Sequence, residues 1–207
     1  TSEGTLYTKN SNFGNPLLSD TTDQKKSGNA SIISNIFDIT YVEPLTKKFR
    51  LEMEYELFNT VNDQERKTFN AINGQYTELD SNYSNIFTTK KIQNRIGTSL
   101  IYEYKKHFLV TGIYVRNVQI ENSNEISLNT INQNVNSILP RVRYRYKISQ
   151  NKRLQFGYNT SSRQPSINQL QPVNDNSNPN RLVLGNPDLL PSYTHRTNVS
   201  YNSYKPI

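Results

Sequence analysis

The chain has 207 residues and a formal net charge of +7, and only 33% of its residues are hydrophobic. This length suits one domain or one piece of a larger one, but the hydrophobic content is low for a compact soluble core. The 14 Tyr and 8 Phe argue against disorder, the absence of Cys excludes disulfides and thiolate metal sites, and no apolar run is long enough for a transmembrane helix.

Several segments alternate apolar and polar side chains, which predicts β-strands because successive side chains of a strand point to opposite faces. The predicted strands are NIFDITYV (35–42), FRLEMEYELF (49–58), RIGTSLIYEY (95–104), HFLVTGIYVRNVQI (107–120), RVRYRYKIS (141–149), RLQFGYNT (153–160) and THRTNVSYNS (194–203). About seven strands in succession predict an all-β fold, an antiparallel up-and-down meander.

Two of these strands separate ionic groups from apolar groups. The ionic face carries Arg141, Arg143, Arg145 and Lys147 in one strand and Glu52, Glu54 and Glu56 in another, and Arg153 extends the positive strip. The opposite face carries Val142, Tyr144, Tyr146, Ile148, Leu51, Met53 and Tyr55. Two environments suit this pattern: a soluble sheet with one packed and one basic face, or a barrel wall with lipid outside and a polar lumen inside.

The predicted connections alternate in length. Short turns lie at 44–47, 105–106 and 150–151. Long polar connections are expected at about 61–91, 121–137 and 162–193. Such alternation is typical of outer-membrane barrels, which have short periplasmic turns and long extracellular loops, and aromatic residues near each short turn suit an interfacial girdle.

Residues 161–193 contain an Arg-x-Pro-Ser element, a following Leu, and the element Gly-Asn-Pro-x-Leu-x-Pro. In these motifs the chain resembles TonB-dependent outer-membrane receptors. The sequence of this stretch is most similar to the outer-membrane β-barrel proteins of Bacteroidota. The Glu that usually follows the last Pro is Ser192 here, so the salt bridge of such a Glu is not carried over. The matching residues are Arg163, Pro165, Ser166, Leu170, Gly185, Asn186, Pro187, Leu189 and Pro191.

The resemblance implies a barrel of about 22 strands with an N-terminal plug, located in the outer membrane of a Gram-negative bacterium. Such a receptor binds a nutrient at the cell surface and passes it to the periplasm. Residues 1–207 are then a partial barrel domain without the plug. The implied partners are outer-membrane lipid, the plug domain, the TonB energy complex and an unknown small ligand, and a surface lipoprotein partner stays open.

Alternatives remain for the sites. The motif loop could gate the extracellular mouth or only fix the path of the chain, and the cation row could guide a substrate or dock the plug. A nucleic-acid surface is not expected, because Tyr144 and Tyr146 lie opposite the Arg row and cannot stack bases beside it. The second candidate is a non-transport surface protein, an adhesin or binding β-sandwich. No catalytic, metal-binding or cofactor motif occurs, so we expect no enzyme and no cofactor.

Overall fold

The computed structural model describes residues 2–10, 20–126, 128–170, 186 and 188–204. Most of these residues lie in one antiparallel sheet, and a single helical turn, α1 (Ile167–Leu170), follows its eighth strand. In this described part, no helix is long and apolar enough to cross a membrane. The strands are β1 (Ser2–Asn10), β2 (Asp20–Pro44), β3 (Phe49–Ile72), β4 (Gln75–Leu79), β5 (Asn85–Tyr104), β6 (His107–Asn124), β7 (Thr130–Ser149), β8 (Lys152–Arg163) and β9 (Ser192–Ser203).

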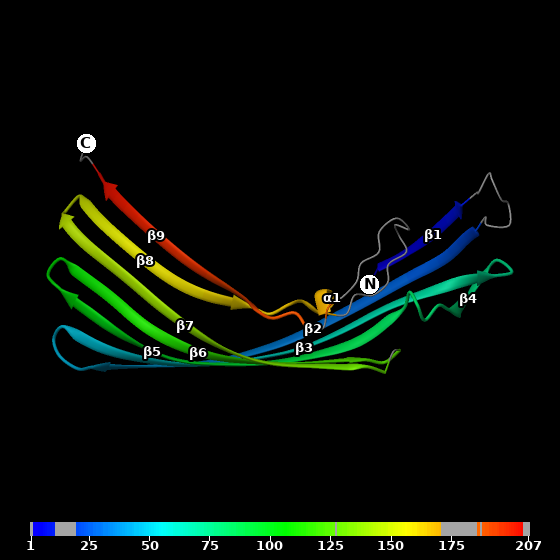
Figure 1. Cartoon of the computed structure of the whole chain (residues 1–207), viewed down its shortest axis with the longest axis horizontal. Coiled ribbons are helices and arrows are strands. Elements are labelled where there is room, and N and C mark those ends of the chain that lie inside the picture. Colours follow the sequence, from blue (N-terminus) through cyan, green and yellow to red (C-terminus); the bar gives the residue numbers. More distant parts are fainter. Residues whose placement is uncertain (1, 11–19, 127, 171–185, 187, 205–207) are drawn as a thin grey trace.

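Neighbouring strands pair in the order β1-β2-β3-β5-β6-β7-β8-β9, with β4 folded back on β3. This up-and-down meander confirms the predicted fold class. Figure 1 shows the sheet bent into an open trough, with β1 and β9 at its two edges. No ladder joins these edges among the described residues, so the sheet is a curved wall that does not close on itself.

The strands continue far into two segments that the sequence predicts as long connections. Only residues 73–84 separate β3 from β5, in place of the predicted 61–91, and this shorter segment contains β4. Only residues 125–129 separate β6 from β7, in place of 121–137. These boundaries are wrong because the strand ends are polar on both faces and therefore lack the alternation that reveals a strand. With β1 and β4, the sheet has nine strands in place of about seven.

The third predicted connection is confirmed where it is described, between the end of β8 and the start of β9. The side-chain carbonyl of Gln169 accepts hydrogen bonds from the backbone N–H (2.9 Å) and the hydroxyl (3.1 Å) of Ser166. Asn186 donates its backbone N–H to the carbonyl of Gln169 at 2.8 Å, so the two motifs meet, and Leu170 is buried. These contacts favour a structural role for the motif loop. Its residues Gly185 and Pro187 lie outside the described part.

Direct partners in the ladders share a face, so the register sorts the side chains into two faces. We name the face that carries the row Glu52, Ser99, Gly112 and Arg141 the inner face. Its side chains are crowded: Tyr114 is 5% exposed and Val118 is fully buried. The opposite, outer face leaves large apolar side chains open, among them Ile96 and Ile138, each 62% exposed. Side chains converge on the concave side of a bent sheet, which explains the difference.

The apolar side chains of the outer face form a band of constant height. Within residues 96–104 of β5, 107–115 of β6 and 138–146 of β7, every second side chain faces outward in register. Each stretch matches the roughly 9–11 residues that a tilted transmembrane strand needs. The band therefore indicates the part of the wall that lies in the hydrocarbon core of a membrane.

Polar groups mark both limits of this band. We call the end of the strands with the short turns the lower end and the opposite end the upper end. Above the band, Asn117 donates hydrogen bonds to the side-chain oxygens of Asn134 (2.7 Å) and Asn136 (2.8 Å) on the outer face. Below it lie the short turns 45–48, 105–106 and 150–151. The strands thus extend beyond the membrane only on the side of the longer connections. The lysines in or beside the short turns are Lys47, Lys48, Lys105, Lys106 and Lys152.

Candidate functional site

Ion pairs between β3 and β5 occupy the middle of the inner face. The guanidinium of Arg95 pairs with the carboxylate of Glu56 at 3.0 Å and also with that of Glu54. Arg95 is 31% exposed, and the two carboxylate side chains are 21% and 24% exposed. Water screens these partly buried pairs less than it screens surface pairs, so losing one partner would leave an uncompensated charge on this face.

Arg141 of β7 extends across β6 and β5 to reach β3. Its Nη2 lies 3.0 Å from Ser99 Oγ on β5 and 3.2 Å from Glu52 Oε1 on β3. Gly112 of β6 occupies the same row, and a Cβ atom there would stand 2.4 Å from Ser99 Oγ. The missing side chain of Gly112 therefore leaves the path that Arg141 follows.

Tyr114 lies between two guanidinium groups. The centre of its ring is 4.6 Å from Cζ of Arg141 and 5.4 Å from Cζ of Arg95. Its hydroxyl donates toward the carboxylate of Glu54 at 3.4 Å. Gly97 is its partner across the ladder, and a Cβ on Gly97 would stand 2.1 Å from Cδ1 of the ring. The tyrosine therefore lies over a backbone that carries no side chain, where both cations can stack on it.

We name the residues that share these contacts the inner-face network. Within it, carboxylates and guanidinium groups alternate and largely neutralise each other, so this wall is polar without having a field of one sign. Among the described residues, no group of His, Asp or Glu is arranged to hold a metal ion. The network consists of Glu52, Glu54, Glu56, Arg95, Ser99, Tyr114 and Arg141.

Below the network, the inner face is hollowed. The hollow has a volume of about 540 Å³, and its polar lining includes Arg141, Arg143, Asn159 and Asn198 beside the apolar Ile101, Phe108 and Val110. The guanidinium of Arg145 stacks over the ring of Phe108 at 4.8 Å. No described carboxylate forms an ion pair with Arg143 or Arg145. The lining also includes Glu52, which pairs with Arg141, so Arg143 is the lining cation without an ion-pair partner among the described residues. A cation beside apolar surface suits a solute or protein segment that carries a carboxylate.

Two further cations border the network on the inner face: Arg116 is the ladder partner of Arg95, and Lys91 lies four residues before Arg95 in β5. Arg116 donates to the backbone carbonyl of Ser162 at 2.5 Å and also to its hydroxyl, and that hydroxyl lies 2.8 Å from the hydroxyl of Ser137. Burial lowers the pKa of Lys91 below its usual range, and the charge of Arg116 lowers this pKa further. The buried Nε atoms of Arg95 and Arg116 have no hydrogen-bond partner, so both keep a spare donor.

The structure separates the two predicted sets of wall residues as the sequence indicated. Arg141, Arg143 and Arg145 lie on the inner face with the glutamates of β3, whereas the alternating residues lie on the outer face. Lys147 and Arg153 are ladder partners at the lower end of the inner face. The outer set is Leu51, Met53, Tyr55, Val142, Tyr144 and Tyr146, and Ile148 lies where the register shifts before a turn.

The sequence did not reveal the residues that connect the two strips. Arg95, Ser99 and Tyr114 belong to strands that were predicted correctly, but each belongs to the network only because of its register with β3 and β7. The available signal was a pair of strand glycines, Gly97 and Gly112, since glycine inside a strand often marks a close approach.

Nitroxide labels on single cysteines at positions 141–144 of the full-length protein in membranes will test the two faces. We expect labels replacing Val142 and Tyr144 to collide mainly with oxygen, which concentrates in lipid, because both side chains lie in the apolar band. Labels replacing Arg141 and Arg143 should collide mainly with a water-soluble reagent. If labels at 142 and 144 were shielded from both reagents, the outer face would be packed against protein and the assignment would be wrong.

One family model and several solved structures match the chain. The search of curated proteins gives no match. Seven chains of solved structures match, among them the ferric citrate transporter FecA in the unliganded form, with 9% identity and a TM-score of 0.45. That alignment covers 69% of this chain and 21% of the transporter, so the chain spans only a small part of that structure. The model of the outer membrane protein beta-barrel family matches residues 1–206. The chain therefore belongs to this family of β-barrel proteins, and its place is the outer membrane.

Proposed function

We propose that the chain is part of a TonB-dependent transporter, which binds a scarce nutrient at the cell surface and passes it to the periplasm. The observation that carries the proposal is the inner face, where a charged wall and a hollow of about 540 Å³ take the place of a packed apolar core. A barrel with such an interior encloses either a path for solutes or a plug that controls one.

In this role the inner-face network holds the wall, and the cations outside it meet the cargo or the plug. Arg143 and Arg145 are the best placed, because they lie beside the hollow and have no ion-pair partner among the described residues. The resemblance of residues 161–193 to TonB-dependent receptors supports a plug domain and an inner-membrane energy complex as partners. The work of the protein is then binding and passage without catalysis.

Uptake by cells that carry or lack the full-length protein will test this role. Siderophore, glycan, peptide and cobalamin are the nutrient classes to supply as the limiting source. We expect saturable uptake of one class that requires the protein and stops when an uncoupler removes the proton gradient of the inner membrane. If deletion changed attachment of cells to surfaces and left uptake of all four classes unaltered, the protein would be an adhesin instead.

A further inference from the structure

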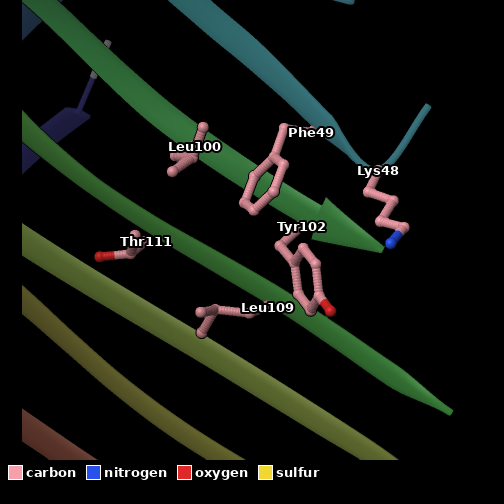
Figure 2. Close-up of a pocket in the computed structure, with 6 residues that line it drawn as sticks. All are labelled: Lys48, Phe49, Leu100, Tyr102, Leu109 and Thr111. Atoms are coloured by element: carbon pink, nitrogen blue, oxygen red, sulfur yellow. The ribbon is translucent and has the colours of Figure 1, made fainter. Parts of the chain in front are cut away.

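A second hollow lies on the outer face, at the lower end of the apolar band. It has a volume of about 400 Å³ and lies beside the short turn between β2 and β3. Figure 2 shows the rings of Phe49 and Tyr102 next to each other in it, with centroids 4.9 Å apart. Its other lining residues are Lys48, Leu100, Leu109 and Thr111. Apolar groups thus line the hollow, and one cation stands at the end nearest the turns.

A second cation lies close by. It is Lys105, whose ammonium nitrogen lies 5.2 Å from the centre of the Tyr104 ring. The ammonium nitrogen of Lys48 lies 3.9 Å from the centre of the same ring. Neither lysine forms an ion pair with a described carboxylate. Nearby Glu103 pairs with Arg50 on the inner face, and Glu43 on the outer face accepts a hydrogen bond from Tyr41. Two like charges that share one aromatic ring repel each other, and an anion between them would remove this repulsion.

The position of the hollow relative to the apolar band indicates which kind of anion could lie between the lysines. The hollow opens into the apolar band above it, and the lysines lie in turns just below the band. In outer-membrane barrels the short turns face the periplasm, where the leaflet consists of phospholipids. A phospholipid joins an acyl chain to a phosphate, and basic side chains just outside the hydrocarbon core attract such head groups.

We propose that this hollow binds one anionic phospholipid of the periplasmic leaflet, with an acyl chain against Leu100, Leu109 and Phe49 and its phosphate between Lys48 and Lys105. The outer face of a barrel stays exposed to lipid when further strands are added at the edges of the sheet. The site therefore does not depend on the rest of the barrel or on the proposed transport role.

Native mass spectrometry of the full-length protein in detergent, titrated with phosphatidylglycerol or with zwitterionic phosphatidylcholine, will test the site. We expect the tightest phosphatidylglycerol to bind about 30-fold more weakly to the K48Q/K105Q variant, the effect of removing two interfacial lysines. The matched control is K25Q/K90Q, which removes two lysines that pair with Glu3 and Glu121 far from the short turns. Leu109→Trp fills the hollow without changing charge and should also weaken binding.

Heat-modifiable migration in gel electrophoresis will show that each variant is folded, so that a loss of binding is not a loss of structure. Equal weakening in K48Q/K105Q and K25Q/K90Q would mean that the lipid responds only to overall charge and would overturn the site. Equal affinity of the wild type for the two lipids would overturn it as well. If inorganic phosphate competed while Leu109→Trp had no effect, the lysines would bind a free anion and the acyl chain would have no part.

Discussion

Replacing Gly97 by Ala is expected to lower the free energy of unfolding of the full-length barrel by about 1–3 kcal/mol, the usual effect of overpacking. The new Cβ would stand 2.1 Å from Cδ1 of Tyr114 and 2.4 Å from Cε1. The ring cannot bend, so it must leave its place between Arg95 and Arg141. Urea unfolding in lipid vesicles, followed by heat-modifiable migration, will measure the change.

The matched control is Gly4→Ala in β1, because no atom lies within 4 Å of the Cβ that this change adds. We expect its unfolding free energy to stay close to that of the wild type. A double-mutant cycle then isolates the cause. In a Tyr114→Ala background the ring is absent, so Gly97→Ala should have little further effect. If Gly97→Ala were as damaging without the ring as with it, contact with Tyr114 would not be the reason for the glycine.

The halves of the strands that carry the apolar band could be predicted from the sequence, and their polar halves beyond the band could not. FRLEMEYELF (49–58) is recognisable as a strand because its apolar and polar side chains alternate strictly, as expected of a wall with lipid on one face and a polar lumen on the other. From Thr60 to Ile72 the same strand, β3, lies beyond the apolar band and carries mostly polar side chains on both faces, so its sequence reads as a loop. The prediction of strands therefore fails where the apolar band ends, because the alternation that reveals a strand ends there too.

The inner-face network was beyond prediction for a different reason. Arg141 and Glu52 are 89 positions apart in the chain, and two other strands lie between theirs in the sheet. Their contact requires the register of three successive ladders, and a shift of one residue in any of them would move one partner to the outer face. The sequence could show that each strip exists, but only the register shows that they neutralise each other.

Replacing Arg95 by Leu is expected to lower the free energy of unfolding by about 2 kcal/mol, because it leaves Glu54 and Glu56 on a partly buried face without their cation. Full burial would cost more, but water still reaches these carboxylates. Arg50→Leu is the matched control: its pair with Glu103 is more exposed, at 45% and 59%, so the expected loss is at most about 1 kcal/mol. Urea unfolding of both variants in vesicles gives the comparison.

Neutralising the glutamates tests whether their unpaired charges cause the loss of stability in Arg95→Leu. In the triple variant R95L/E54Q/E56Q no carboxylate is left without a partner at this point, so we expect most of the lost stability to return. Recovery would mean that β3 and β5 use these charges on each other and that the pairs stabilise the wall. If Arg95→Leu instead left stability unchanged and reduced uptake, the pairs would contribute little to the wall, and Arg95 itself would be a contact for cargo or plug.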